Sequence, residues 1–208
     1  MTETDIVVHI VDDDEAVRHS LAFLLTNSGF AVRLHPSATA FLEQAKTGGN
    51  GCLVTDLRMP DMSGVQLLQR LRKAGMTLPT IVITGHGEVR MAVEAMKNGA
   101  LDFIEKPFSE EVLIESIRQA VSAAASQQDG EASRESIRQR LASLSERERQ
   151  VLKAVLKGQV NKTIGFQLGI SARTVEVHRA ALMAKMQARS LAELVRMVLG
   201  QVNEEDWE

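Results

Sequence analysis

Short apolar runs alternate with amphipathic stretches over the first 125 residues of the chain. The apolar runs are rich in β-branched residues and lie at 6–11, 31–35, 51–56, 80–85 and 102–106. Between them, apolar residues recur at helical spacing. Apolar strands that alternate with helices are typical of a parallel sheet covered on both faces. The pattern therefore predicts an α/β, doubly wound domain of five strand–helix units.

Polar residues end or follow four of these predicted strands, namely Asp12, Asp13, Asp14, Asp56, Thr84 and Lys106. In doubly wound folds ligands bind outside the carboxyl ends of the strands, so these side chains are expected to converge at one edge. Carboxylates this close repel one another unless a cation lies between them, and their hard oxygen atoms suit Mg²⁺. One carboxylate could then attack a phosphoryl group, while Lys106 and Thr84 neutralise the transferred oxygens.

Each of these residues also has an ordinary explanation. Asp14 can cap the helix that follows it. A Lys-Pro pair after a strand usually forms a turn. Their joint occurrence at four strand ends favours a functional site over these separate explanations.

The sequence after residue 140 has the pattern of several short helices. Segment 144–158 places its apolar residues on one helical face, and Ser145 with Glu148 forms a predicted capping box. Ser190 and Glu193 form a second predicted box at the start of a final helix. These signals predict an all-α domain of four helices.

The middle of this region predicts two short helices joined by a tight turn. Segment 161–169 begins with Asn161 as its predicted N-cap and ends at Gly169, which supplies the turn. Ser171 then caps the next helix. Two such helices in a basic region indicate a helix-turn-helix.

A helical wheel separates two faces of the segment after Ser171. The inward stripe consists of Val175, Leu182 and Met186. The opposite face carries small and polar residues that let the backbone approach a major groove, and we predict DNA contacts for Arg173, Thr174, Glu176, Val177 and Ala180. In that groove Arg173 could pair with guanine, Glu176 with cytosine and Val177 with a thymine methyl group.

Four further residues are better placed for the DNA backbone than for bases: Asn161, Lys162, His178 and Arg179. Arg179 lies beside the apolar stripe, so we expect a buried stem and at most a phosphate contact. For His178, a structural role is as consistent with the pattern as a phosphate contact.

Charge is segregated along the chain, although the formal net charge is only −3. Residues 1–125 carry 16 acidic and 11 basic side chains, whereas 134–200 carry 5 acidic and 13 basic ones. The small, polar segment between them is typical of a linker or a frayed helix. We therefore predict a first domain at 1–122, a linker that could be helical at 123–140, and a DNA-binding domain at 141–208.

The composition of this 208-residue chain, with 44% hydrophobic and 25% charged residues, is that of a globular protein. No apolar run approaches the roughly 18 residues that a membrane helix needs. The N-terminus lacks the basic leader of a signal peptide. The single cysteine, Cys52, cannot form an internal disulfide. We expect a cytoplasmic protein that does not contact the membrane.

The motifs VDDDEAVR (11–18), DLRMPDMSG (56–64), ITG (83–85) and FIEKPF (103–108) resemble the receiver domain of two-component response regulators. The resemblance implies a sheet of order 2-1-3-4-5 and phosphorylation of Asp56 by a sensor histidine kinase. Lys106, followed by a cis Pro107, would bind the phosphoryl oxygens. The Mg²⁺ ligands that it implies are Asp12, Asp13, Asp56 and the backbone carbonyl of Arg58.

The same resemblance implies a conformational switch. Thr84 and Phe103 would be the pair that rearranges on phosphorylation, and Phe103 stands where many relatives carry Tyr, so no phenolic hydrogen bond can report the state. A dimer face near the helix at 88–98 would include Val89, Val93 and Phe103. The chain would then be a monomer that dimerises when phosphorylated.

The motifs LSERERQVL, NKTIGFQLGIS, RTVEVHRAALMAKM and ARSLAEL resemble the four-helix DNA-binding domain of the LuxR/NarL group of transcription factors. The combined architecture resembles activators of nitrogen-fixation genes. That resemblance implies an oxygen-sensing haem kinase, promoter DNA and RNA polymerase as partners, with transcription activated under low oxygen.

Two other classes of protein fit parts of the pattern. A Mg²⁺-dependent phosphohydrolase would also use an aspartate at a strand end, but it usually needs a second acid close behind the nucleophile, where this chain has Arg58, and a substrate cap. A constitutive DNA-binding protein with an inactive receiver is disfavoured by the intact acidic pair, Thr84 and Lys106. We therefore predict a phosphorylation-controlled transcription factor and not an enzyme with turnover on a separate substrate.

Overall fold

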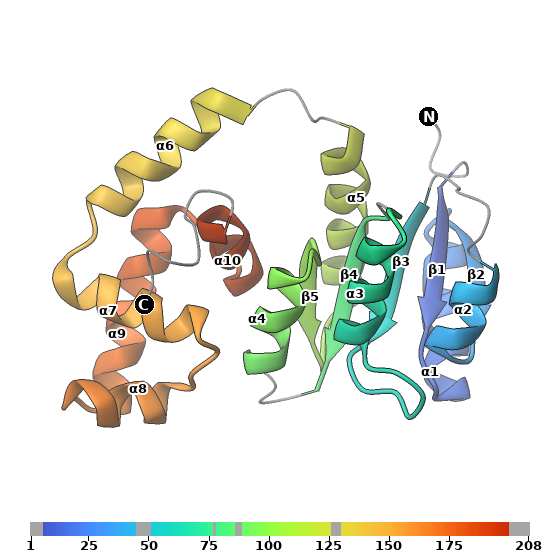
Figure 1. The fold of residues 1–208 in the computed structure, drawn as a ribbon, viewed down its shortest axis with the longest axis horizontal. Helices are drawn as coiled ribbons and strands as arrows, with labels where there is room; N and C mark the ends of the chain where they lie inside the picture. The colour runs from blue at the N-terminus through green and yellow to red at the C-terminus, as the bar shows by residue number, and fades with distance from the viewer. Residues whose placement is uncertain (1–5, 45–50, 77, 86–88, 126–129, 200–208) are drawn as a thin grey trace. The chain divides into compact units, whose positions relative to one another are not determined.

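The computed structural model describes residues 6–44, 51–76, 78–85, 89–125 and 130–199, and the chain divides into two compact units (Figure 1). The first unit consists mainly of residues up to 126 and the second mainly of the residues after it. Each unit has its own set of buried apolar side chains.

Five strands form the sheet of the first unit: β1 (Val7–Val11), β2 (Ala31–His35), β3 (Gly51–Asp56), β4 (Thr80–Thr84) and β5 (Asp102–Glu105). Neighbouring strands are all parallel, and their order is β2-β1-β3-β4-β5. The predicted fold class is confirmed, and the strand bounds lie within one residue of the predicted ranges. The agreement reflects how fully the β-branched runs are buried, as in β4, where all five residues are buried.

Helices cover both faces of this sheet (Figure 1). One face carries α1 (Glu15–Asn27) and α5 (Glu110–Ala125), and the other carries α2 (Ala38–Gln44), α3 (Gly64–Lys73) and α4 (Val89–Lys97). Asp14 caps α1, since its carboxylate accepts hydrogen bonds from the backbone N–H groups of Ala16 and Val17.

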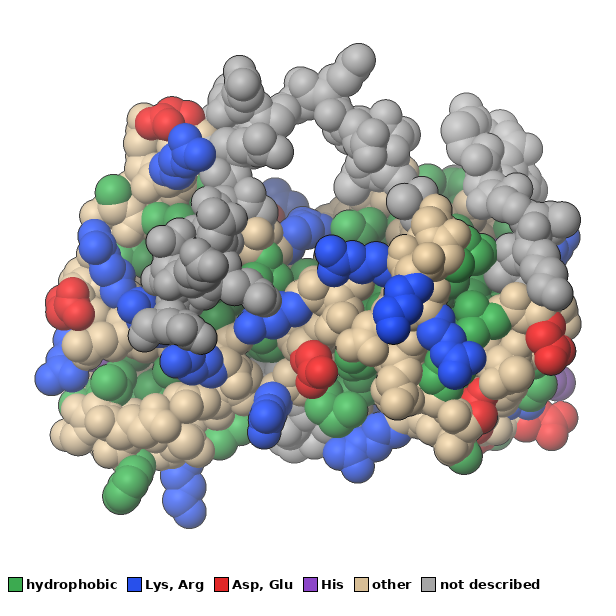
Figure 2. All heavy atoms as spheres, in the orientation of Figure 1, with side chains coloured by type: hydrophobic (Ala, Val, Ile, Leu, Met, Phe, Trp, Pro, Cys, Tyr) green, Lys and Arg blue, Asp and Glu red, His purple; other side chains and the backbone are tan. Residues whose placement is uncertain are grey.

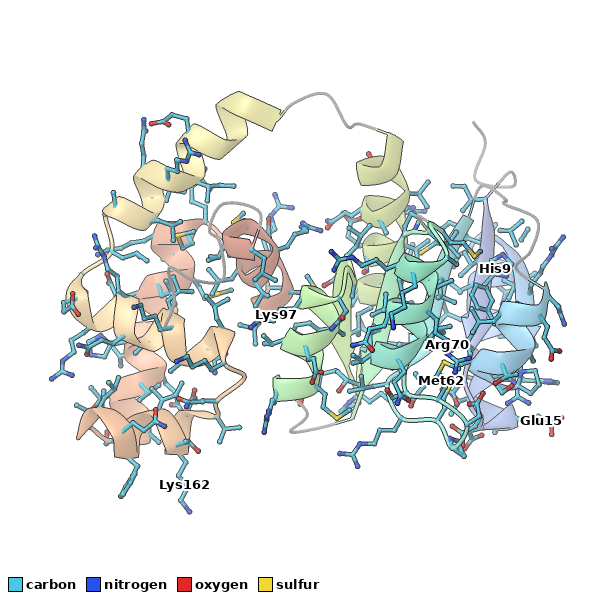
Figure 3. All side chains as sticks on the ribbon, viewed as in Figure 1. His9, Glu15, Met62, Arg70, Lys97 and Lys162 are labelled. Atoms are coloured by element: carbon cyan, nitrogen blue, oxygen red, sulfur yellow. The ribbon has the colours of Figure 1, made fainter. Side chains whose placement is uncertain are left out.

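Two buried apolar clusters hold the helices to the sheet. Val8 and Ile10 of β1 point into the cluster that contains Leu25 and Ile117, whereas Val11 belongs to the cluster on the opposite face with Phe41. Each fully buried large aliphatic side chain contributes about 1.5–3 kcal/mol. The sheet is therefore a rigid support for the residues at its carboxyl edge, where Glu15 and Met62 lie in Figure 3.

A pair of histidines is packed on one face of the sheet, a feature that the sequence analysis did not anticipate. His9 Nδ1 lies 3.0 Å from His35 Nε2, the two rings are stacked, and both meet the edge of Phe41. Burial, with the nearby charge of Arg33, lowers the pKa of His9. Burial and then the His9 and Arg33 charges lower the pKa of His35 to about 4. One of the two ring nitrogens must carry a hydrogen and donate it to the other. Burial disfavours a positive charge on either ring.

The histidine pair should make the first unit sensitive to acid. The unfolded His35 binds a proton below its ordinary pKa of 6.5, whereas the folded form resists it down to about 4. The free energy of unfolding should therefore fall as the pH drops from about 6.5 to about 4, by up to about 3 kcal/mol from His35. Urea unfolding at several pH values measures this loss. In His35→Leu, where the new side chain has a similar volume and does not titrate, the free energy of unfolding should fall less steeply with pH. An equally steep fall would show that His35 does not cause the acid sensitivity.

Among the described residues after 129, the second unit contains five helices: α6 (Gly130–Ala142), α7 (Glu146–Leu156), α8 (Asn161–Leu168), α9 (Ala172–Met186) and α10 (Leu191–Leu199). The predicted inward stripe of α9 is confirmed, because Val175, Leu182 and Met186 are buried. Gly169 ends α8 in the left-handed conformation, with φ of 66°, as the predicted tight turn requires.

The predicted helix caps are mostly confirmed in this unit. Ser145 and Glu148 form the capping box of α7, and Ser171 accepts from the Thr174 N–H at the start of α9. The second predicted box is incomplete. Ser190 accepts from the Glu193 N–H, but the Glu193 carboxylate accepts from the N–H of Arg189 and not from that of Ser190.

The prediction that Asn161 caps α8 is wrong. The N-cap is Val160, which makes no side-chain cap hydrogen bond, and Asn161 is the first helical residue. The physical reason is a contact distant in sequence: the Asn161 Oδ1 atom accepts a hydrogen bond from Arg179 Nη1 at 2.8 Å. The oxygen that would have capped the helix is therefore engaged with α9.

Three basic side chains fix the end of α6 to its unit. Arg149 donates to the carbonyl of Ala142 at 3.0 Å, and Lys185 donates to that of Ser143 at 3.3 Å. Arg140 donates to the carbonyl of Met186, at the end of α9, at 3.0 Å. Residues 130–140 of the predicted linker are thus helical. Within 119–142, the structure describes the end of α5, up to Ala125, and the whole of α6, from Gly130 onward. None of the helices of the described residues is long and apolar enough to span a membrane.

Candidate functional site

Two charged side chains meet at the carboxyl edge of the sheet. Asp56 is the last residue of β3, and Lys106 follows β5 immediately. The Lys106 Nζ atom donates to Asp56 Oδ1 at 2.8 Å, although the residues are 50 positions apart in sequence. The other oxygen, Oδ2, accepts the backbone N–H of Arg58 at 2.7 Å. Both oxygens of the Asp56 carboxylate are therefore held in fixed directions.

Asp12 is the buried carboxylate of this edge, with 3% of its surface exposed. Its Oδ1 atom accepts the N–H of Asp14 at 2.9 Å, whereas Oδ2 makes no hydrogen bond and lies 3.7 Å from Lys106 Nζ. Burial is the main cause that raises the pKa of Asp12, and the negative charge of Asp56 raises it further. The site holds more negative charge than its hydrogen bonds offset, which is the condition that attracts a cation.

Lys106 supplies the opposing positive charge. Burial alone would lower the pKa of Lys106, but the hydrogen bond to Asp56 and the charges of Asp56 and Asp12 outweigh it and raise that pKa. The peptide bond between Lys106 and Pro107 is cis, as expected. The ammonium group is therefore fixed beside both carboxylates in its charged form.

The oxygen atoms of this edge fit the predicted magnesium ion in part. Asp12 and Asp56 share the edge, and the unpaired buried Oδ2 of Asp12 is a hard oxygen donor of the type that Mg²⁺ prefers. Asp13 is exposed, and the structure does not bring three acidic, histidine or cysteine side chains of the described residues together as a metal cluster. Because Mg²⁺ usually takes one or two protein carboxylates and keeps several waters, a two-carboxylate core is sufficient.

Two contacts that the sequence analysis missed shape this site. Arg18 donates to the backbone carbonyl of Asp12 at 2.7 Å, which ties α1 to the end of β1. Gly64 lies at the start of α3, where an added Cβ would come within 2.7 Å of the Asp56 carbonyl oxygen. The loop after Asp56 therefore requires glycine at position 64. The Met-Ser-Gly run at 62–64 is the feature of the sequence that could have indicated this requirement.

The predicted switch residues lie close to this edge. Thr84 is the last residue of β4 and is 2% exposed, and its hydroxyl donates to the Gly85 carbonyl at 3.2 Å. Phe103 is partly buried in β5, next to β4 in the sheet. Val93 lies on α4. The side chain of Val89 lies outside the described residues.

In the second unit, the outward face of α9 is formed as predicted. Arg173, Thr174, Glu176, Val177 and Ala180 are all exposed. Val177 is 63% exposed, so its side chain is available for contact with a thymine methyl group. Lys and Arg side chains are spread over the face of this unit that Figure 2 shows. The exposed face of α9 thus combines small residues, such as Ala180, with the basic Arg173.

The residues predicted for the DNA backbone differ in exposure. Lys162 is exposed and points away from its unit (Figure 3), whereas Asn161, His178 and Arg179 are partly buried. Arg179 is joined to Asn161, and burial lowers the pKa of its guanidinium group, although the charge of Glu176 acts in the opposite direction.

Comparison with known proteins assigns both units to families. Residues 8–118 match the response regulator receiver domain, and residues 142–198 match the luxR family of bacterial regulatory proteins. The chain therefore belongs to the two-component response regulators that carry a LuxR-type DNA-binding domain.

Within that class the chain is similar to the transcriptional regulatory protein FixJ. It is 61% identical to FixJ of Rhizobium meliloti over 94% of this chain and 96% of that protein. It is 54% identical to FixJ of Azorhizobium caulinodans over 92% of this chain and 91% of that protein. The crystal structure of full-length FixJ from B. japonicum has a TM-score of 0.59 and 46% identity, and the match covers 96% of this chain and all of that one. This chain is thus a FixJ-like response regulator.

Proposed function

We propose that Asp56 accepts a phosphoryl group and that this modification controls the binding of promoter DNA by the second unit. The observation that carries the proposal is the contact between Lys106 Nζ and Asp56 Oδ1 at 2.8 Å, beside the buried carboxylate of Asp12. A nucleophilic carboxylate, a fixed cation and a second acid are the groups that aspartyl phosphorylation requires.

The phosphoryl group would come from a histidine of a sensor kinase. The phosphorus–nitrogen bond breaks, a bond from phosphorus to an Asp56 oxygen forms, and the released imidazole takes a proton. Lys106 then transfers its hydrogen bond from the carboxylate to a phosphoryl oxygen, and the Thr84 hydroxyl donates to another. Most of the catalysis in phosphoryl transfer is this kind of electrostatic stabilisation.

Asp12, Asp13, Asp56 and the backbone carbonyl of Arg58 would hold the Mg²⁺ ion. The bound ion would neutralise charge on the transferred phosphoryl oxygens. The Oδ2 atom of Asp12 supports this assignment, because it is buried and accepts no hydrogen bond, and a buried polar atom without a hydrogen bond is costly.

Phosphorylation adds a charge of about −1.5 to −2 at the edge of the sheet and biases the position of Thr84 and Phe103. We propose that the surface around α4 and β5 then forms a dimer contact that includes Val89, Val93 and Phe103. Coupling of this kind is typically about 1–3 kcal/mol, so the modification shifts an equilibrium between monomer and dimer. Two α9 helices would then meet a two-fold-related DNA site.

We further propose that the partner kinase is a FixL-like, oxygen-sensing haem kinase and that the targets are nitrogen-fixation genes. The support is the 61% and 54% sequence identity to two FixJ proteins, over 94% and 92% of this chain. A cytoplasmic location follows from the proposed binding of chromosomal DNA.

Sedimentation velocity and DNA binding test the proposal together. The full chain, treated with acetyl phosphate and Mg²⁺, should sediment as a dimer and enrich specific duplexes from a randomised pool. The untreated chain should remain a monomer and enrich them weakly. If the phosphorylated protein neither dimerises nor gains affinity for DNA, the proposed coupling is wrong.

RNA polymerase is the proposed partner of the outer face of α8. Phe166 on this face is 89% exposed, more than any other large apolar side chain of the described residues, and Lys162 lies one turn before it. An exposed aromatic ring beside a cation fits an acidic and apolar protein surface. Phe166→Ala should leave DNA affinity within about twofold but lower transcription in vitro several-fold. Gln167→Ala, on the same exposed helix, is the control; an equal loss of DNA binding and transcription in Phe166→Ala would contradict a polymerase contact.

A further inference from the structure

The contact between Arg179 and Asn161 joins the two helices of the helix-turn-helix. Arg179 lies on α9 and Asn161 is the first residue of α8, 18 positions earlier, and their side chains are 2.8 Å apart. The Arg179 side chain is partly buried, and its acceptor is an uncharged amide rather than a carboxylate. Burying a guanidinium group against a neutral acceptor costs free energy, because the acceptor carries no full charge to compensate for the lost hydration. The contact is therefore not explained as an ion pair.

The chemistry of the pair fixes the orientation of the Asn161 side chain. A guanidinium group has only donors, so the carboxamide must turn its oxygen toward Arg179. Its NH₂ group is then the end that remains for another partner, and it can only donate. The positions of the oxygen and nitrogen atoms in the Asn161 carboxamide therefore follow from the contact with Arg179, which can only donate hydrogen bonds.

The pair lies beside the predicted DNA-binding face. Arg179 is close enough to the exposed Glu176, one turn earlier on α9, for the charge of Glu176 to act on its pKa, and Asn161 stands next to the exposed Lys162 at the start of α8. A group that can only donate hydrogen bonds is suited to a phosphate oxygen, whereas an exposed carbonyl oxygen would be repelled by it.

We propose that Arg179 is a positioning residue, which turns Asn161 so that its NH₂ group binds a DNA phosphate, and that Arg179 itself contacts no phosphate. This inference replaces the separate phosphate contact expected for Arg179 from the sequence. It rests on the proposed DNA-binding function of this unit.

A double-mutant cycle separates positioning from direct contact. The variants are Asn161→Ala, Arg179→Met and their combination, each in the phosphorylated full chain. The probe is a single duplex that the wild type has enriched from a randomised pool. Each single substitution should weaken binding roughly tenfold for each half-site, and so about a hundredfold for the two half-sites together, as expected for one hydrogen bond to a charged group in each. The double substitution should cost no more than either one, because both remove the same contact.

The salt dependence of binding gives a second, independent readout. Arg179→Met should leave the slope of log affinity against log salt unchanged, because no phosphate loses a cationic partner. Lys162→Met, the matched control on the exposed side of α8, should reduce the slope by about 1. Arg179→Lys, which can still donate to Asn161, should recover part of the lost affinity.

Asn161→Asp tests the donor directly. The new carboxylate would keep the contact with Arg179 as an ion pair, so the unfolding temperature should be unchanged or higher, yet it offers no donor to a phosphate. Binding should fall at least as far as in Asn161→Ala, and further than in Gln167→Glu, which adds the same charge at another exposed position of α8.

Three outcomes would overturn the inference. Additive costs with a reduced salt slope for Arg179→Met would show that Arg179 contacts phosphate directly. Unchanged affinity in Asn161→Ala would show that the pair only holds the two helices together. Failure of the phosphorylated wild type to enrich any duplex would remove the DNA-binding function itself, and that failure is visible before any variant is made.

Discussion

Asp56→Asn should abolish phosphorylation of the chain by acetyl phosphate in the presence of Mg²⁺. The substitution keeps the size of the side chain and its position at the end of β3, but an amide is not a nucleophile toward phosphorus. Intact-protein mass should show one phosphoryl group on the wild type and none on the variant. The label on the wild type should be stable and stoichiometric, without rapid turnover, as a response regulator rather than a phosphohydrolase requires.

Asp61→Asn is the matched control for this experiment. Asp61 lies in the same loop, but its carboxylate accepts hydrogen bonds from the backbone and hydroxyl of Thr39, both at 2.9 Å, and not from Lys106. Asparagine can accept the same bonds, so phosphorylation should be close to that of the wild type. Equal labelling of Asp56→Asn and the wild type would remove Asp56 from the proposed mechanism.

Lys106→Met should slow phosphorylation by about a hundredfold, the usual cost of removing one fixed electrostatic donor from a reaction of this kind. The methionine keeps the length of the stem but leaves the transferred oxygens without the ammonium group. The loss should persist at saturating Mg²⁺, because a metal ion cannot donate the hydrogen bond that Lys106 Nζ donates to the oxygens. The rate of phosphoryl incorporation, measured over a range of Mg²⁺ concentrations, checks both statements.

The affinity for Mg²⁺ should change in the opposite direction in this variant. Lys106 lies 2.8 Å from Asp56 and 3.7 Å from Asp12, so its removal leaves two carboxylates without their positive neighbour. Half-maximal phosphorylation should therefore need less Mg²⁺ than in the wild type. Lys73→Met, at an exposed position on α3, controls for loss of a positive charge. A rate no lower than that of this control would show that Lys106 has no part in the transfer.

The sheet and its edge were predictable because local patterns and global fold agree there. The apolar runs that became β3 and β4 are buried almost throughout, and a run of that kind has few alternatives to a central parallel strand. Once the strands are parallel, Asp56 and Lys106 must lie at the same edge. The 2.8 Å contact between Asp56 and Lys106 agrees with this expectation. The ends of the predicted strands were enough to expect the two side chains close together.

The features that escaped prediction depend on contacts between distant parts of the chain. Asn161 has the ideal residue type for a helix cap, but the partner that takes its oxygen lies on another helix, so local preference gave the wrong role. The pairing of His9 with His35 required the register of β1 against β2, in which Arg33 and not His35 lies opposite His9.

The attachment of α6 determines where the second unit can be cut from the chain. A fragment that begins at residue 141 would retain the four helices of the LuxR-type match but lose Arg140, whose guanidinium donates to the carbonyl of Met186 at the end of α9. A fragment that begins at residue 130 keeps this bond, and it should resist thermolysin longer and melt at a higher temperature. The same hydrogen bond connects α6 to the end of α9. A movement of α6 would therefore either break this bond or displace the last turn of α9, so the segment predicted as a linker is structurally coupled to α9.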